Sequence, residues 1–476
     1  MEYEIVIGLE VHLQLKTKTK VFCGCSTEFG QPPNTQTCPV CLGLPGALPM
    51  LNEEAFLYAI KVALALQCEI QPLVKFDRKN YYYPDLPKNF QISQFDKPLS
   101  YNGALETVSD GARKKIRIRR VHLEEDAGKL IHETKGDYSL VDFNRASMPL
   151  LEIVTEPDLN APQEAYNYLA ALKSILEYLE VSDCDMEKGS LRCDANISAR
   201  KKGSQKLGEK VEVKNMNSFK AVRSALEYEA NRQRSALESG ETIRQETRLW
   251  DPGKELTLPM RSKEEAHDYR YFPEPDLVPF VVEQAVIDRI RESLPELPRA
   301  RRQRFIKAFE LSEYDALMLT TEKGIADYFE ACAGLYKNRK AIANWIMGEI
   351  AGHLNDRKTD IRGLGVPPEN LTSLCAMIDD GTISGKTAKE VLAEMIDTRK
   401  GPQEIVRSRG LTQISDKDDI EEVVRKVIDA NRKTVDDYRS GKKNALVYLV
   451  GQVMKETKGR AHPHLVNEIL RKILGD

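Results

Sequence analysis

The feature that most constrains the fold is an alternation of apolar and polar side chains at the start of the chain. In residues 4–14 one face holds Ile5, Ile7, Leu9, Val11 and Leu13, and the other holds Glu4, Gly8, Glu10, His12 and Gln14. A period of two is typical of a β-strand that is buried on one side. We therefore expect this segment to lie in a sheet with one face packed on a core and one polar face.

Helix and hairpin signals continue this pattern through the first ~290 residues. Asn52 is a candidate N-cap for a helix that starts with EEAFLYAIKVALALQ, and Pro162 stands at the first turn of a second helix. Two strand-like runs, LRCDANISA and KVEVKN, flank the polar segment KKGSQKLGE and predict a hairpin.

Domain organisation follows from a change of pattern after the Pro-rich stretch YFPEPDLVP and again near LPELPRARR. From about residue 296 the pattern is almost entirely helical. We expect an α+β fold with a mixed or antiparallel sheet, an all-helical domain and a small helical tail. The expected bounds are 1–294, 295–406 and 407–476.

Composition excludes two broad classes. Hydrophobic residues make up 41% of the 476 residues and charged ones 30%, which excludes general disorder. No run reaches the ~18 apolar residues that a membrane span needs. The start of the chain resembles neither a signal nor a transit peptide. We expect a soluble, cytoplasmic protein without a membrane partner.

Charge is nearly balanced overall but not locally. The net charge is −3, so any nucleic-acid contact must be local. Between residues 439 and 472 two acids, Glu456 and Glu468, face eight basic residues: Arg439, Lys442, Lys443, Lys455, Lys458, Arg460, Arg471 and Lys472. This excess predicts a phosphate-binding patch, and a solvated helix face is the alternative.

Four of the nine cysteines, Cys23, Cys25, Cys38 and Cys41, form a C-x-C-x12-C-P-x-C motif. Reduced thiols at this spacing suit a closed tetrahedral zinc site, and four thiolates leave no open position for catalysis. We therefore expect structural zinc. The alternative is a coincidental cluster, or a site that has lost its metal.

Acidic residues recur on several strand-like segments. They are Glu10 beside His12, Glu124 and Glu125 in HLEEDAGK, Glu152 in LLEIVTEPD, Asp194 in the first hairpin strand and Glu212 in the second. Carboxylates that project from separate strands repel one another unless cations lie between them. Hard oxygen ligands favour Mg²⁺, commonly held with substrate phosphates. A solvated polar sheet face is the alternative.

Two further segments have features of ligand sites. GTISGKT (381–387) has three residues where a Walker A loop has four and follows a helical stretch, so we interpret it as a helix–turn–helix connection. The Tyr-rich block FDRKNYYYPDLPKNFQISQFD (76–96) could position a polar ligand or form an ordered surface loop.

Long motifs across the chain resemble one family. IGLEVHLQL, the Tyr-rich block, HLEEDAGK, YSLVDFNRASMPLLEIVTEPD, GSLRCDANIS, EVKNMNSF, HDYRYFPEPDLVP and YLVGQVMKETKGRAHPHLVNEIL resemble the B subunit of the tRNA-dependent amidotransferase, the GatB family. A related archaeal family carries a large inserted domain, for which this chain has no room.

The resemblance implies an ATP-dependent ligase. Such an enzyme phosphorylates the side-chain carboxyl of Glu-tRNA(Gln), Asp-tRNA(Asn) or both, and ammonia then displaces the phosphate. An amidase, the A subunit, supplies the ammonia from glutamine, and the small C subunit joins the two in a heterotrimer. A glutaminase nucleophile is not evident here, because position 2 is Glu and we find no amidase-type Gly/Ser-rich stretch. The family fold is a cradle-like catalytic domain, a helical domain and a tail that contacts tRNA.

By similarity the resemblance assigns site residues. The catalytic candidates are Glu10, His12, Glu124, Glu125, Glu152, Asp194 and Glu212, and all except Glu124 are magnesium candidates. The cofactor-binding candidates are Lys79, Tyr82, Lys214 and Asn215, with Lys79 and Tyr82 near the point where ammonia enters. A non-catalytic tRNA-binding scaffold and a ligase for free amino acids stay open as alternatives.

Overall fold

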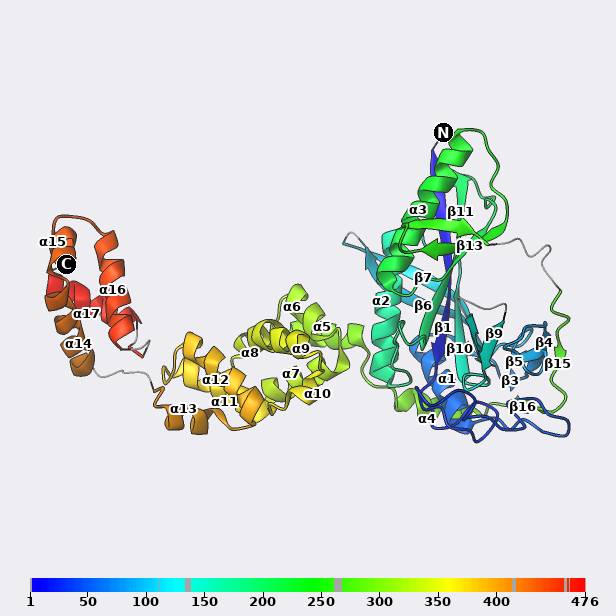
Figure 1. Cartoon of the computed structure of the whole chain (residues 1–476), viewed down its shortest axis with the longest axis horizontal. Helices are drawn as coiled ribbons and strands as arrows, with labels where there is room; N and C mark the ends of the chain where they lie inside the picture. Colours follow the sequence, from blue (N-terminus) through cyan, green and yellow to red (C-terminus); the bar gives the residue numbers. More distant parts are fainter. Residues whose placement is uncertain are drawn as a thin grey trace. The chain divides into compact units, whose positions relative to one another are not determined.

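A computed structural model describes residues 2–109, 111–132, 138–260, 268–412, 417–457, 460–461 and 463–475. The chain forms two compact units, Met1–Pro298 and Arg299–Asp476. The first mixes strands and helices, and the second is helical (Figure 1). The α+β class is thereby confirmed.

A nine-stranded mixed sheet is the centre of the first unit, in the order β14-β13-β12-β11-β1-β10-β7-β6-β2. All neighbours pair antiparallel except β12 and β13, which are parallel. The strands are β1 (Tyr3–Gln14), β2 (Glu69–Ile70), β6 (Ser100–Ser109), β7 (Ala112–Glu125), β10 (Pro149–Thr155), β11 (Leu191–Lys201), β12 (Val211–Lys214), β13 (Glu246–Asp251) and β14 (Leu256–Pro259). The predicted first strand and the β11–β12 hairpin are confirmed.

One face of this sheet packs against helices. Ile7, Val11 and Leu13 of β1 are fully buried in a core shared with α1 (Glu53–Ala65), α2 (Pro162–Leu179) and α3 (Phe219–Glu238). Figure 1 shows α2 and α3 along the sheet. Each buried Leu or Ile of this core contributes about 1.5–3 kcal/mol, which fixes the register of the strands and leaves the opposite face for polar residues.

Both predicted helix starts are confirmed. The Asn52 side chain accepts a hydrogen bond from the backbone N–H of Ala55, as an N-cap does. Pro162 occupies the first turn of α2, where a missing N–H costs nothing.

Short strands and one helix complete the first unit. A three-stranded sheet has the order β15-β4-β5, and two pairs join β16 to β3 and β8 to β9. Their bounds, with that of the helix, are β3 (Leu73–Val74), β4 (Asp77–Asn80), β5 (Phe90–Ser93), β8 (Lys129–His132), β9 (Ser139–Asp142), β15 (Phe272–Pro273), β16 (Phe280–Val281) and α4 (Gln284–Glu292).

Helices alone build the second unit in its described part. They are α5 (Pro298–Phe309), α6 (Glu313–Leu319), α7 (Lys323–Leu335), α8 (Arg339–Trp345), the π-helical turn η1 (Ile346–Ile350), α9 (Ala351–Arg357), α10 (Ile361–Leu364), α11 (Pro368–Asp379), α12 (Gly385–Thr398), α13 (Pro402–Arg409), α14 (Lys417–Ala430), α15 (Arg432–Arg439), α16 (Asn444–Glu456) and α17 (Pro463–Leu474). GTISGKT joins α11 to α12, so the helix–turn–helix interpretation is confirmed. Of the described helices, none is long and apolar enough to cross a membrane.

The last four helices share a core of their own. Ile420, Val424, Leu449, Val453 and Leu470 are fully buried in it. The division at residue 406 stays a prediction, because residues 299–476 cluster as one unit.

Candidate functional site: an acidic sheet face and a four-cysteine cluster

The polar face of β1 presents Glu10 and His12 to its neighbouring strands. Glu10 lies opposite Asp194 of β11, and His12 lies opposite Glu152 of β10. The Nε2 atom of His12 is 3.5 Å from a carboxylate oxygen of Glu10 and 3.5 Å from one of Glu152. The alternation that buries Leu9 and Val11 thus gathers these four polar side chains on the other face.

Strand β7 adds a second row to this acidic face. His122 lies opposite Glu152, with its Nε2 atom 3.4 Å from Glu124 and 3.8 Å from Glu152. The guanidinium of Arg120 approaches the other oxygen of Glu152 at 3.4 Å. One ligand atom from each of His12, Glu124 and Glu152 lies within 4.8 Å of the other two. The same holds for Glu10, His12 and Asp194.

Strand β12 extends the face on its other side. The Lys214 ammonium is 2.7 Å from Asp194 and 3.2 Å from Glu212. The hydroxyl of Thr247 donates to Glu212 at 2.9 Å. Burial alone would lower the pKa of Lys214, but the two carboxylates raise it above its ordinary value. The Lys214 ammonium therefore pairs with both Asp194 and Glu212.

Burial and neighbouring charges shift the pKa values of the ionisable groups on this face. Burial and the charge of Glu152 raise the pKa of Glu10. Burial would lower the pKa of His12, but its contact with Glu152 and the charge of Glu124 raise it to about 9. For Glu152, burial opposes ionisation, yet His122 and His12 hold the pKa well below its ordinary range. The carboxylates and bases of this face therefore stabilise each other's charged forms.

Glu125 lies apart from this group. Its neighbours of the same parity, Val121 and Leu123, are buried in the core, so its side chain leaves the opposite face of β7 from Glu124. The carboxylate of Glu125 is 1% exposed and accepts from the Lys88 ammonium at 2.5 Å and from Ser147 Oγ at 2.6 Å. The structure therefore does not bring Glu125 into the cluster of the other predicted magnesium candidates.

The four predicted cofactor-binding residues divide into two kinds. Lys79 is half-buried with its Nζ atom 4.8 Å from the ring centre of Tyr269, and the charge of Glu124 raises its pKa although burial would lower it. Lys214 belongs to the acidic face. Tyr82, in contrast, is 76% exposed, and the Asn215 amide donates to the backbone oxygen of Trp250 at 3.0 Å.

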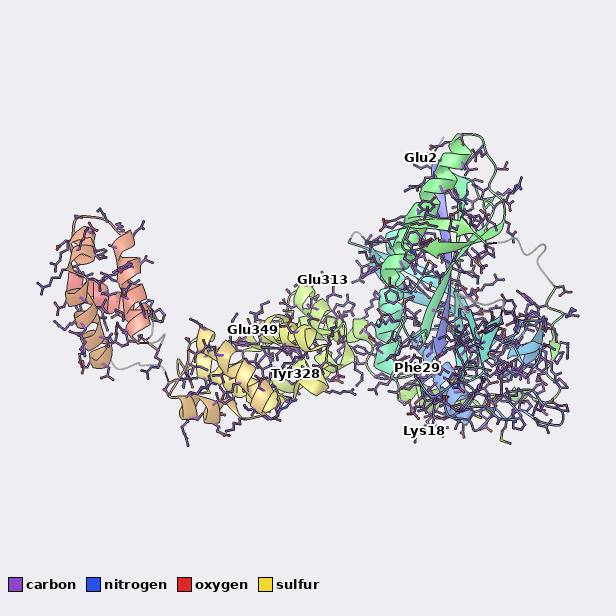
Figure 2. All side chains as sticks on the ribbon, viewed as in Figure 1. Glu2, Lys18, Phe29, Glu313, Tyr328 and Glu349 are labelled. Carbon is purple, nitrogen blue, oxygen red and sulfur yellow. The ribbon has the colours of Figure 1, made fainter. Side chains whose placement is uncertain are left out.

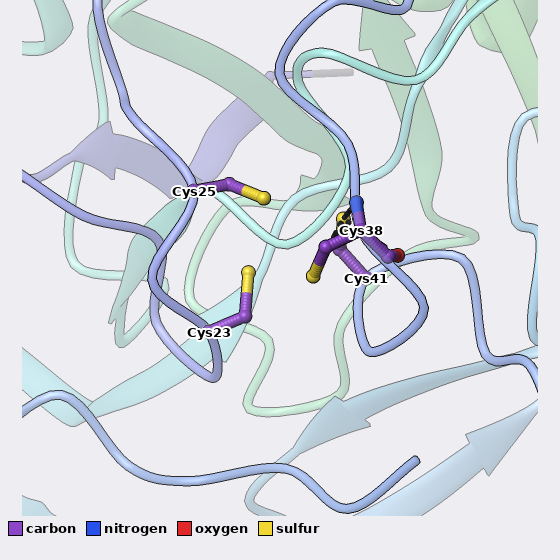
Figure 3. A group of neighbouring side chains, drawn as sticks. All are labelled: Cys23, Cys25, Cys38 and Cys41. Atoms are coloured by element: carbon purple, nitrogen blue, oxygen red, sulfur yellow. Dashed lines mark hydrogen bonds between the residues drawn. The ribbon is translucent and has the colours of Figure 1, made fainter.

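The four cysteines converge on one point from two loops (Figure 3). Their sulfur atoms all lie within 4.8 Å of one another, and Cys38 Sγ is 3.9 Å from Cys41 Sγ. Four thiolates around a tetrahedral zinc with bonds of about 2.3 Å stand about 3.8 Å apart. The hydrogen bond from the Cys23 thiol lowers the pKa of Cys41 to about 5, against burial, which would raise it. The donor set fits a soft divalent metal.

Comparison with known proteins identifies the family. The family described as "GatB/GatE catalytic domain" matches residues 5–288, and the "GatB domain" matches residues 327–474. The chain belongs to the GatB/GatE family. This confirms the resemblance stated from the motifs.

Relatives of this GatB/GatE-family chain align over their whole lengths. A protein from Caldanaerobacter subterraneus subsp. tengcongensis is 57% identical over 474 residues, 100% of both chains. One from Carboxydothermus hydrogenoformans is 57% identical over 99% of this chain and 98% of its own, and one from Moorella thermoacetica 55% over 100% of both. Each is named as the B subunit of aspartyl/glutamyl-tRNA(Asn/Gln) amidotransferase. The chain is thus part of a ligase that forms carbon–nitrogen bonds.

Sequence reasoning about this GatB/GatE-family chain overlooked two residues of the acidic face. His122 contacts both Glu124 and Glu152, and Arg120 contacts Glu152. The signal was present in the run RRVHLEE of β7, where Arg120, His122 and Glu124 share one parity. The sequence-based prediction considered the carboxylates and left out the basic residues Arg120 and His122.

A further acid, Asp126 of the HLEEDAGK segment, was not among the predicted site residues. Asp126 is 5% exposed and accepts from Gln14 and from Arg192, each at 2.8 Å. Burial would raise the pKa of Asp126, but Arg192 and Arg145 lower it. This group closes one end of the acidic face with paired charges.

Proposed function

We propose that this chain phosphorylates the side-chain carboxyl of the amino acid on misacylated Glu-tRNA(Gln), Asp-tRNA(Asn) or both, with ATP as donor. Ammonia then replaces the phosphate and gives Gln-tRNA(Gln) or Asn-tRNA(Asn). The printed names of the relatives support the amino acids and tRNAs, and their designation as B subunits supports the presence of partner chains. The observation that carries the proposal is the convergence of Glu10, Glu124, Glu152 and Asp194 from four adjacent strands.

The acidic face fits Mg²⁺ by the chemistry of its donors. Oxygen ligands dominate both candidate sets, one formed by Glu10, His12 and Asp194 and the other by His12, Glu124 and Glu152. Glu212 stands beside the first set. When bound, Mg²⁺ supplies charge neutralisation for a transferring phosphoryl group. His12 is a nitrogen donor, which is unusual for a hard cation, so it binds directly or orients a carboxylate.

Basic residues around the face would bind the negative charges of the substrates. Arg120 contacts Glu152, Lys214 contacts Asp194, and the charge of Lys79 interacts with that of Glu124. Their charge favours the phosphates of ATP and the carboxylate that is to be activated. Phosphoryl transfer depends mainly on such positioning and neutralisation, because little covalent chemistry is left to the protein.

The partners follow from the same reaction. An amidase, the A subunit of the complex, would release ammonia from glutamine, and the small C subunit would hold the two enzymes together. The exposed basic residues of the last helices, Lys455, Arg471 and Lys472 among them, would contact tRNA phosphates. Lys458, part of the predicted patch, lies outside the described residues. Aminoacyl-tRNA as substrate favours a cytoplasmic location.

The deciding experiment uses the assembled complex with Glu10→Gln. We expect tRNA-dependent ATP hydrolysis and amidation to be lost, with glutamine hydrolysis by the partner retained and no rescue by ammonium. Glu4→Gln is the matched control, because Glu4 lies on the same strand but pairs with Arg200. Wild-type amidation by Glu10→Gln would refute the proposed site.

Substrate choice is tested with Glu-tRNA(Gln) and Asp-tRNA(Asn) side by side. Free glutamate and aspartate are included in the same assay. Amidation of the free amino acids would favour a ligase without tRNA. ATP hydrolysis that is independent of misacylated tRNA would also contradict the proposal.

A further inference from the structure

Lys20 is a charged residue in the core of the first unit. It is 0% exposed and is among the largest fully buried side chains of the described residues. Its ammonium donates to Cys41 Sγ at 3.7 Å and to the backbone oxygen of Phe143 at 3.3 Å. Neither partner is a carboxylate. An isolated buried ammonium is costly, so a charge must compensate it.

Anionic sulfur is the one source of that charge among the groups described around Lys20. The Cys41 thiol contacts the ammonium directly and belongs to the four-cysteine cluster. Four thiolates around one divalent metal carry a net charge of −2, which a buried cation partly balances. The charge of the cluster therefore explains why Lys20 can be buried beside Cys41.

The same region is attached to a second segment, residues 141–148. Asn34, between the two cysteine pairs, accepts from the backbone N–H of Phe143 at 2.8 Å and donates to the oxygen of Val141 at 3.0 Å. Asn144 donates to the backbone oxygen of Pro32 at 2.7 Å. Lys20 thus lies where the metal loops and this segment meet.

Segment 141–148 in turn contacts the end of β7. The Ser147 hydroxyl donates to Glu125, and the backbone N–H of Ser147 donates to the oxygen of Asp126 at 2.9 Å. The N–H of Asp126 donates to the oxygen of Met148 at 2.9 Å. A continuous set of contacts therefore runs from the cysteines to the strand that carries Glu124.

We propose that Lys20 is the charge partner of a metal bound by the four cysteines, and that it ties this metal centre to segment 141–148 behind the acidic face. Lys20 is a positioning residue and touches no substrate. The role does not depend on the reaction proposed above, because its test measures metal retention, spectra and folding rather than amidation.

The first test measures zinc in the full chain with Lys20→Met. We expect about one zinc per chain in both wild type and variant, and release to a chelator at least tenfold faster in the variant, because a favourable charge beside the thiolates is gone. Lys61→Met is the matched control: its ammonium donates to the oxygen of Leu179, away from the cysteines. A wild type without zinc after reconstitution, or equal release rates, would overturn the proposal.

A spectroscopic test separates charge from packing. In the cobalt-substituted protein, loss of the Lys20 hydrogen bond makes the sulfur a better electron donor, so the sulfur-to-cobalt charge-transfer band moves to lower energy. Lys61→Met leaves the band unchanged. If Lys20→Met does not fold, Lys20→Gln serves, because it keeps a donor for Phe143 without the charge. An unmoved band in the folded variant assigns Lys20 to packing alone and rejects the proposal.

Hydrogen exchange tests the second half of the inference. We expect backbone amides of residues 141–148 to exchange faster in Lys20→Met and in Cys38→Ser/Cys41→Ser than in wild type. Exchange in α3 serves as the internal reference. Unchanged protection of 141–148 in both variants would show that the metal centre does not hold this segment.

Discussion

The four-cysteine cluster and the acidic face are two candidate metal sites built on opposite principles. The cysteines come from 19 consecutive residues and supply soft sulfur ligands. The acidic face collects oxygen ligands from β1, β7, β10, β11 and β12, which span residues 3–214. The first set is local in sequence, and the second is assembled from strands that are distant in sequence.

This difference limits the role that each candidate site can have. Four thiolates occupy all four coordination positions of a tetrahedral metal, so the cysteine cluster is suited to holding loops together. The loop between the cysteine pairs includes Phe29, which is 73% exposed (Figure 2). The acidic face instead combines carboxylates with the basic residues Lys79, Arg120 and Lys214. We therefore expect variants of the first to affect folding and variants of the second to affect chemistry.

Glu152→Gln should show the largest effect. Glu152 is contacted by His12, His122 and Arg120. We expect amidation by the complex to fall about 10³-fold, a loss typical of a removed electrostatic contact at a reacting centre. The free energy of unfolding of the full chain should also fall, because His12, His122 and Arg120 lose a buried counter-charge. A steady-state assay and denaturant titration measure both, and a loss of stability without loss of rate would reverse the comparison.

Cys38→Ser/Cys41→Ser should show the opposite pattern. Zinc should be lost, and the free energy of unfolding should fall by at least ~4 kcal/mol, as expected when a structural metal is removed. The kcat of the fraction that remains folded should stay near wild type. Elemental analysis, denaturant titration and active-site titration provide the values. A metal-free variant that is fully folded but inactive would contradict a structural role.

Lys88→Met tests whether Glu125 belongs to the acidic face or to the core. Lys88 is 9% exposed and pairs with the buried Glu125. Removing one partner of a buried pair costs about 3–5 kcal/mol, because the other charge is left uncompensated. Lys202→Met is the control, since its pair with Glu2 is exposed and its loss should leave the unfolding midpoint unchanged. Equal midpoints for the two variants would show that Glu125 is compensated by another group.

Neutralising Lys455, Arg471 and Lys472 together should show the smallest effect. All three are exposed, and the salt slope of tRNA binding should fall by about 0.7–0.9 for each phosphate that is no longer neutralised. We expect a several-fold higher Kd for tRNA and an unchanged KM for ATP. Arg425 and Lys426, each paired with a glutamate one turn earlier, are the control pair. An unchanged salt slope would identify the patch as a solvated helix face.

Much of the fold could be predicted because its signals are local. The alternation around Val11, the cap at Asn52 and the first-turn Pro162 each depend on a few neighbouring residues, and all three are found as expected. Strand order could not be predicted, since β1 lies between β10 and β11 only after distant segments pair.

The candidate site shows the same limit. Alternation predicts that Glu10 and His12 share one face of β1. It also requires that the adjacent acids Glu124 and Glu125 leave opposite faces of their strand, without telling which one joins the acidic face. Their hydrogen bonds to segments far away in sequence decide the difference: Ser93 donates to Glu124, whereas Lys88 and Ser147 donate to Glu125. The assignment of individual ligands to metal ions stays a prediction.

The family, the α+β class, the polar face of β1 and the spacing of the four cysteines can all be read from the sequence, because each depends on contiguous residues or on their order. Tertiary structure alone decided which side chains meet. It placed His122 and Arg120 against Glu152, turned Glu125 toward Lys88, and buried Lys20 beside Cys41. The physical reason is that charge compensation acts through space, over a few ångströms, between residues that can stand far apart in the chain.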